Sequence, residues 1–176
     1  MRILGIDPGL RCTGYGLIDS NGRQLRLLEA GIVRTQSNQP ISQRLHTIYE
    51  GLHELVDEHR PDYVVIEKIF AHYKHPTTAI LMGHARGVVC LIAGMFHIPL
   101  ENIPSTRVKK AVVSQGHASK LQVQRTIQRI LSLKQLPEPC DVADALAIAI
   151  AFAFTHSHSS LSWSNGVDMK TKVSLS

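Results

Sequence analysis

A chain of 176 residues, of which 44% are hydrophobic and 19% charged, is expected to form one soluble globular domain, and no apolar run approaches the roughly 20 residues that span a membrane. The three cysteines are widely spaced and form no C-x-x-C pair, and MRILGIDPG lacks the features of a secretory signal, so we expect a cytoplasmic protein without a disulfide framework. The net charge is +5, with ten Lys or Arg against a single acid between residues 68 and 137, which favours a nucleic acid partner over a solvated basic face.

The N-terminal part of the chain is predicted to contain three antiparallel strands. Residues 2–7, RILGID, form an apolar run that ends at Asp7 within a DPG turn signal. Residues 13–20 and 23–34 flank Asn21-Gly22, the preferred two-residue turn of a β-hairpin, because both turn positions take a positive φ. We therefore expect a hairpin directly after the first strand.

The rest of the chain alternates between helical and strand patterns. Apolar residues spaced by three and four between Ile41 and His59 predict an amphipathic helix that Pro61 stops. Pro139 suits the first position of a final helix rich in Ala, Ile and Phe. The other predicted elements are strands at 62–67 and 98–103 and helices at 78–96, at 106–113 behind an N-cap at Ser105, and at 119–133.

This order of elements predicts an α/β fold. We expect a mixed five-stranded sheet, with three antiparallel strands first and parallel strands afterwards, flanked by helices. Residues 1–154 are expected to form a single domain. Residues 155–176 are polar and rich in Ser, and we expect them to be a disordered tail.

Two acidic residues each end a buried apolar strand. Asp7 ends the first predicted strand, and Glu67 ends the strand at 62–67. Functional groups gather at the carboxyl ends of strands in α/β sheets, so the two carboxylates would converge if these strands are parallel neighbours. The alternative for either acid alone is that it caps a turn or pairs with a nearby base.

Two further acids open the apolar segment CDVADALAIAIAFAF, residues 140–154. Asp141 and Asp144 are three residues apart and therefore lie on one face of a helix. Asp141 alone fits a first-turn acid that the helix dipole favours. Asp144 directly precedes a stripe that must be buried, and a buried carboxylate needs a partner. An Arg of the basic segment or a divalent cation would be such a partner.

Four converging carboxylates would repel one another, and this repulsion raises their pKa values. Mg²⁺ binds oxygen ligands from a few carboxylates and keeps several of its waters. Two such ions per subunit, with Mn²⁺ as a substitute, would neutralise the four acids and form a two-metal centre for in-line displacement at a phosphodiester. Together with the basic segment, the residues themselves predict a metal-dependent nuclease.

The motifs ILGIDPGLRCTGYG, VVIEKIF, GHARGV and DVADALAIAI, in this order, resemble the RuvC family of Holliday junction resolvases. The resemblance covers residues 1–154 and includes RVKKAVVSQGHASKLQVQ. It implies an RNase H-like fold and a structure-selective endodeoxyribonuclease. Such an enzyme binds a four-way junction as a homodimer, resolves it by paired symmetric nicks in DNA recombination and repair, and works with a branch-migration motor complex. Gly83 and Gly87, one helical turn apart, would allow close packing at the dimer interface.

The resemblance also assigns roles to individual residues. It implies that Phe70 stacks on bases near the opened crossover, and that Lys109 and Lys120 contact the scissile phosphate or the DNA backbone. The segment after Phe70 departs from the family pattern, with His75-Pro76 where the family has an Asn followed by Ser-Ala-Leu. The implied catalytic metal ligands are Asp7, Glu67, Asp141 and Asp144.

Three more residues are candidate DNA contacts. Tyr73 flanks the same polar loop as Phe70, and Lys110 adjoins Lys109 on a predicted helix near the expected phosphate. Arg86 in the GHARG motif is grouped with them, although a structural role is its simpler interpretation.

Two other functions use the same features. A non-catalytic junction-binding module on the same fold would be favoured by a missing acid, but all four acids are present. An actin-like or sugar-kinase-like ATPase also opens with an Asp after its first strand. That fold needs a second Gly-rich phosphate loop and a longer chain than 176 residues.

Overall fold

The structure is a computed structural model, and it describes residues 1–22, 24–68, 76–112 and 119–163. The elements occur in the predicted order, three strands first and three helices last. They are β1 (Arg2–Asp7), β2 (Cys12–Ser20), β3 (Leu25–Arg34), α1 (Ile41–His59), β4 (Tyr63–Glu67), α2 (Pro76–Met95), β5 (Leu100–Ile103), α3 (Ser105–Val112), α4 (Lys120–Ile130) and α5 (Cys140–Trp163).

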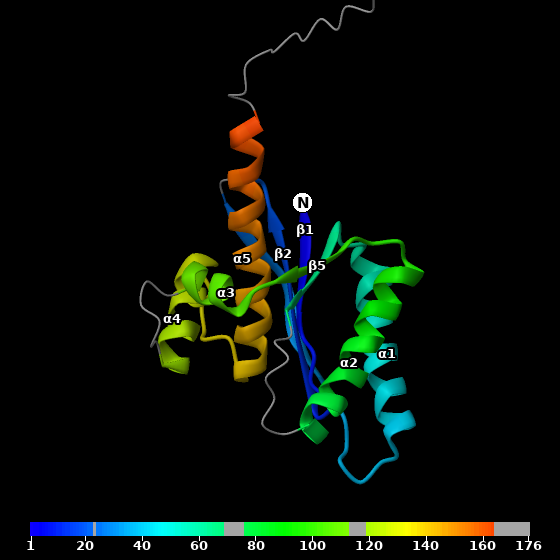
Figure 1. Cartoon of the computed structure of the whole chain (residues 1–176). Coiled ribbons are helices and arrows are strands. Elements are labelled where there is room, and N and C mark those ends of the chain that lie inside the picture. The colour runs from blue at the N-terminus through cyan, green and yellow to red at the C-terminus, as the bar shows by residue number, and fades with distance from the viewer. Residues whose placement is uncertain (23, 69–75, 113–118, 164–176) are drawn as a thin grey trace, which may run out of the picture.

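The five strands form one mixed sheet in the order β3-β2-β1-β4-β5. β1 and β3 both pair antiparallel with β2, whereas β4 pairs parallel with β1 and with β5. The predicted sheet is thereby confirmed. Helices α3, α4 and α5 cover one face of this sheet, and α1 and α2 cover the other (Figure 1). No helix within the described ranges is long and apolar enough to cross a lipid bilayer.

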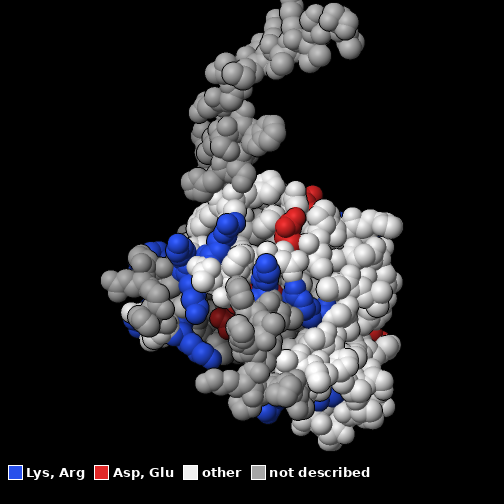
Figure 2. All heavy atoms as spheres, viewed as in Figure 1, with Lys and Arg blue, Asp and Glu red and all other residues white. Residues whose placement is uncertain are grey.

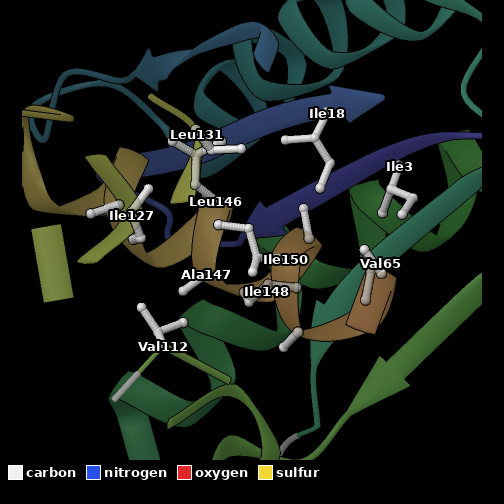
Figure 3. Close-up of a cluster of buried hydrophobic side chains, with 14 of the residues drawn as sticks. Ile3, Ile18, Val65, Val112, Ile127, Leu131, Leu146, Ala147, Ile148 and Ile150 are labelled. Atoms are coloured by element: carbon white, nitrogen blue, oxygen red, sulfur yellow. The ribbon is translucent and has the colours of Figure 1, made fainter. Parts of the chain in front are cut away.

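Successive side chains along each strand point to opposite faces of the sheet and contribute to two hydrophobic cores. Leu4 and Ile66 face α1 and α2, whereas Ile3 and Val65 face α5. On the α5 side, residues of the sheet meet Leu146 and residues of α3 and α4 (Figure 3). Burying each such Leu or Ile stabilises the fold by about 1.5–3 kcal/mol. This core fixes α5, and with it the acidic first turn of that helix, against the sheet.

Glycines let α5 approach the sheet closely. A Cβ added at Gly14 in β2 would collide with the backbone carbonyl of Asp141, and one added at Gly5 in β1 would collide with the carbonyl of Ala145. Gly14 lies directly opposite Asp7 in the ladder between β1 and β2. The start of α5 therefore lies on β2, next to the end of β1.

The β2–β3 hairpin is confirmed, but its predicted two-residue turn is wrong. Four residues separate Ser20 from Leu25, which is its partner in the ladder, and the amide of Gln24 donates to the Asn21 side-chain oxygen at 2.8 Å. Gly22 has the expected positive φ of 84°. An irregularity between Leu17 and Ile18 shifts the register again.

The last helix is longer than predicted. It continues through residues 155–163, the first part of the expected polar tail, and residues 164–176 lie outside the described residues. No Gly or Pro interrupts residues 140–163, and the ring of His156 contacts those of Tyr63 and Phe152 at centroid distances of 5.4 and 5.5 Å. These contacts hold His156, just beyond the predicted end of the helix, against β4 and α5, which composition alone does not reveal.

Candidate active site

Asp7 and Glu67 lie side by side at one end of the sheet. Their strands are parallel neighbours, and Ile6 pairs with Ile66 one residue earlier, so Asp7 and Glu67 follow at the ends of adjacent strands, whose backbones a sheet spaces about 4.8 Å apart. Both side chains point to the α5 face, because they continue the alternation set by Ile3 and Val65. The predicted convergence of these two acids is thereby confirmed.

Asp141 and Asp144 lie on the first turn of α5, over the same end of the sheet. The backbone of Asp141 lies directly over Gly14, which is the ladder partner of Asp7. Asp141 is half-buried, whereas Asp144 is exposed. The expectation that Asp144 is buried is wrong, because its side chain lies on the exposed face of α5, although Val142, Ala143 and Ala145 around it are buried.

Electrostatic coupling connects the four carboxylates. The pKa of Asp7 is raised to about 6, first by burial and then by the negative charges of Asp144, Asp141 and Glu67. The pKa of Asp144 is raised by desolvation and by Asp141, against the opposing charge of Lys120. Within the described ranges, none of the four lies within 4 Å of a Lys, Arg or His nitrogen. These four acids, here called the carboxylate centre, therefore carry more negative charge than nearby basic side chains neutralise.

Glu67 is held by two groups of α3. Burial raises the pKa of Glu67, and repulsion from Asp144 adds to this, whereas the charge of Lys109 and a hydrogen bond from the Ser105 side chain lower it. Ser105 was expected to be the N-cap of α3. That prediction is wrong by one position, because the Pro104 carbonyl accepts the bonds from the amides of Arg107 and Val108.

Basic side chains surround the carboxylates. Figure 2 shows Lys and Arg atoms gathered around a recess in which acidic atoms are visible. Lys109 and Lys120 each favour the ionised form of one carboxylate, which places the two lysines within electrostatic range of the centre, and their contact with DNA stays a prediction. Lys110 is exposed on α3 beside Lys109. Phe70 and Tyr73 lie outside the described residues.

Arg86 supports Glu67 from α2. Its Nη1 donates to the backbone carbonyl of Glu67 at 2.7 Å, and its other terminal nitrogen donates to the side-chain oxygen of Asn102 in β5. The guanidinium thus ties α2 to the ends of two adjacent strands. These contacts favour the structural interpretation, and contact of Arg86 with DNA stays a prediction.

The carboxylate centre suits hard divalent cations by its chemistry. It offers oxygen ligands and unneutralised negative charge, which are the properties that Mg²⁺ selects. Within the described part of the chain, however, no three His, Cys, Asp or Glu side chains already lie at distances that would hold a metal ion. A cation would therefore have to draw the carboxylates together.

Two thiols beside Asp141 were not expected at the site. The Cys12 side chain forms a hydrogen bond with Asp141, and burial followed by the charge of Asp141 raises the pKa of the thiol. Cys140 Sγ lies 3.9 Å from Asp141 Oδ2 and 4.0 Å from Lys120 Nζ. Both cysteines are free thiols, and only their positions in the fold, next to β1 and at the start of α5, indicate their proximity to the centre.

The sequence and the fold match one family. A family model described as crossover junction endodeoxyribonuclease RuvC matches residues 3–152. Proteins of the same description from Rhodopirellula baltica and Brevibacillus brevis are 47% and 42% identical, over 82% and 83% of this chain and 82% and 87% of their own lengths. The structure of T. thermophilus RuvC in complex with Holliday junction substrate has a TM-score of 0.84 and 34% identity, covering 90% of this chain and 96% of that one. The chain therefore belongs to the RuvC family of crossover junction endodeoxyribonucleases, and it is an endonuclease with an RNase H-like fold.

Proposed function

We propose that this protein resolves four-way DNA junctions by cutting two strands of like polarity with a divalent-cation centre formed by Asp7, Glu67, Asp141 and Asp144. The observation that carries the proposal is the electrostatic coupling of these four acids at one end of the sheet. The 34% identical T. thermophilus protein, solved with a Holliday junction substrate, supports the choice of DNA. Residues 1–154 would form the nuclease domain.

Mg²⁺, as two ions per subunit, is the cation we propose, with Mn²⁺ as a substitute. Bound at the four carboxylates, these ions would supply an activated water and stabilise the leaving 3′ oxygen. The chain leaves these carboxylates free for metal ions, because none of them forms an ion pair within 4 Å with a basic side chain of the described ranges. It also orients Glu67 through Ser105.

The lysines around the centre would bind the anionic substrate. Lys109 and Lys120 already interact with carboxylates of the centre, so a phosphate at these carboxylates would lie within reach of both cations. Lys110 would hold the DNA backbone farther along α3. We further propose that Phe70 and Tyr73, which follow Glu67 in the chain, stack on unpaired bases at the crossover.

Two symmetric cuts need two centres, and we propose that a homodimer provides them through α2. Ile80, Leu91 and Met95 of α2 are 62%, 56% and 49% exposed and lie along one helix face. At Gly83 and Gly87 an added Cβ would meet no atom within 4 Å. In Figure 2 the visible surface over α2 is largely free of charge. An apolar, open face of this kind is typical of a surface that a second subunit covers.

The setting of the reaction follows from the same reasoning. We propose that the protein acts in the cytoplasm, in DNA recombination and repair, where it receives junctions from a branch-migration motor complex. The free state of all three cysteines supports a reducing compartment.

The test is to map the cut positions on a synthetic four-way junction with a mobile core, in the presence of Mg²⁺. We expect paired, symmetric nicks. Asp144→Asn should lower the cutting rate by roughly 100-fold or more while junction binding stays within about twofold, because the acid serves the reaction and not the fold. Asp57→Asn, which changes an exposed acid of α1, is the matched control and should cut normally. Tight binding by the wild type without nicking under any divalent ion would favour the non-catalytic module instead.

A further inference from the structure

A second basic site adjoins the carboxylate centre. A cavity of about 560 Å³ is bordered by the loop after β1, the start of β2, the end of β3 and the segment that leads to α1. Asp141 belongs to its wall, so the cavity adjoins the carboxylate centre. None of the described residues that line it comes from α3 or α4, the helices that carry Lys109 and Lys120.

Local hydrogen bonds give the cavity a defined shape. The amide of Thr35 donates to the carbonyl of Arg11 at 3.2 Å, and its hydroxyl donates to the carbonyl of Leu10 at 2.6 Å. Nε of Arg44 in α1 donates to the same hydroxyl at 3.0 Å. Cys12 and Arg34 are partners in the β2–β3 ladder. The loop after β1, the end of β3 and the start of α1 are thereby joined into one wall.

The charges of the cavity are not matched from within the protein. Arg11 and Arg34 line it, both are exposed, and neither forms an ion pair within 4 Å with an acid of the described residues. Asp141 is the one acid among its described lining residues. Arg34 also borders a cavity between β3 and α1 that is lined by acidic residues, whereas Arg11 does not border that cavity.

The other lining groups identify the kind of ligand. Gln36, Ser37 and Asn38 add side chains that donate hydrogen bonds to an anion. The described lining contains no aromatic ring on which a base would stack. Arginines with small polar donors, and without a stacking surface, are suited to a phosphate of the nucleic-acid backbone and not to a base.

We infer that this cavity binds a backbone phosphate of the DNA strand that is cut, next to the scissile phosphate. The inference deepens the proposed function and rests on it. The cleaved strand would cross the first turn of α5, with its scissile phosphate at the four carboxylates and a flanking phosphate at Arg11 and Arg34. Lys109 and Lys120 would contact the strand from α3 and α4, so the carboxylate centre has cations from two separate parts of the fold around it.

The test measures junction affinity as a function of salt for Arg11→Gln, without divalent cations. Losing one phosphate contact should weaken binding roughly tenfold and reduce the slope of log K against log salt concentration by about one. Arg26→Gln is the matched control, because Arg26 lies on β3, its side chain is 75% exposed, and it does not line the cavity. It should leave both quantities unchanged. Thermal unfolding of both variants checks that each one folds.

A set of junctions, each with one neutral methylphosphonate in the cleaved strand, identifies the phosphate. One flanking position should weaken binding by the wild type as much as Arg11→Gln does, and should not weaken binding by Arg11→Gln further, because both changes remove the same contact. The inference is wrong if Arg11→Gln matches Arg26→Gln in affinity and slope, or if its effect adds to that of every methylphosphonate. Failure of the wild type to cut junctions would instead overturn the proposed function, so the two failures are distinguishable.

Discussion

The guanidinium of Arg86 donates a hydrogen bond to the backbone carbonyl of Glu67, with Nη1 and the oxygen 2.7 Å apart. Arg86 lies on α2, whose exposed face is the proposed dimer interface, and Glu67 belongs to the carboxylate centre. A second hydrogen bond from Arg86 to Asn102 fixes the plane of the guanidinium. One side chain thus connects the helix of the proposed interface to the proposed active site.

Arg86→Lys is predicted to lower the cutting rate while junction affinity is retained. Lysine keeps the positive charge but cannot donate two hydrogen bonds in the fixed geometry of a guanidinium, so Glu67 loses its support. We expect a fall in kcat of about 10-fold or more, and a higher Mg²⁺ concentration for half-maximal cutting, since misplaced supporting groups weaken metal sites by about that factor. The measurement is a Mg²⁺ titration of cutting at saturating junction.

Asn102→Ala serves as the partial control for this prediction, because it removes one of the two acceptors of Arg86 and leaves the bond to Glu67. It should shift the Mg²⁺ dependence less than Arg86→Lys does. If Arg86→Lys lowered junction affinity instead, with kcat and Mg²⁺ dependence unchanged, Arg86 would be a DNA contact, as the sequence first suggested.

Asp7→Asn is predicted to stabilise the metal-free protein above about pH 6. The pKa of Asp7 is raised to about 6 in the folded protein, whereas the unfolded chain releases this proton near its ordinary value of 3.8. The folded protein therefore binds more protons between these values, and its free energy of unfolding falls as pH rises through this window and levels off above it. Asparagine removes this loss, which is on the order of 2–3 kcal/mol.

Thermal unfolding from pH 4 to pH 8 checks this prediction, with EDTA in one series and Mg²⁺ in another. Mg²⁺ should stabilise the wild type above pH 6 by neutralising the carboxylates, and it should stabilise Asp7→Asn much less. Glu67 and Asp144 also have raised pKa values, so part of the fall with pH remains in the variant. A variant less stable than the wild type at pH 8 in EDTA would show that the Asp7 carboxylate supports the fold.

Gly14→Ala is predicted to displace the first turn of α5 and to reduce cutting per folded molecule. The added Cβ would collide with the backbone carbonyl of Asp141, so the helix start must move. Overpacking of this kind costs about 1–3 kcal/mol of folding stability.

Gly16→Ala is the matched control in the same strand, because its added Cβ meets the side chain of Leu146, beyond the carboxylates. Both variants should lose stability, measured by urea unfolding, but only Gly14→Ala should lose activity after correction for the folded fraction. Equal activity of the two variants would contradict the close-approach argument.

The arrangement of the four carboxylates was predictable because it depends on patterns that are local in the sequence. Apolar runs ending at Asp7 and Glu67 mark strand ends, and the segment between them provides the helix that a parallel connection needs. Two acids three residues apart, Asp141 and Asp144, define one helix face. Once the two strands are parallel neighbours, convergence follows from the geometry of the sheet.

The cavity lined by Arg11 and Arg34 was not predictable, because it depends on the register of the β2–β3 hairpin. The two-residue turn expected at Asn21-Gly22 would place Gly31 opposite Cys12. The four-residue connection and the irregularity between Leu17 and Ile18 instead bring Arg34 opposite Cys12, beside the carboxylate centre. A change in the register of the β2–β3 pairing costs little free energy within the turn itself. The register is decided by packing of the hairpin on α1 and α5, and the sequence of the turn does not encode this packing.

Cys12 is predicted to be protected from alkylation by bound junction. Cys12 lines the cavity of Arg11 and Arg34 beside Asp141, so a phosphate bound in that cavity would block the approach of a thiol reagent. Because burial and Asp141 raise the pKa of Cys12, little thiolate exists at pH 7, and its alkylation should be slower than that of the exposed Cys90 and should speed up as pH rises. Mass spectrometry of the cysteine peptides, in a Cys140→Ser background with and without junction in EDTA, measures each rate. Cys90 lies on α2, outside the cavity lining, and is the internal control for reagent activity, because its rate should be the same with and without junction. Equal alkylation of Cys12 with and without bound junction would argue that the strand does not occupy the cavity.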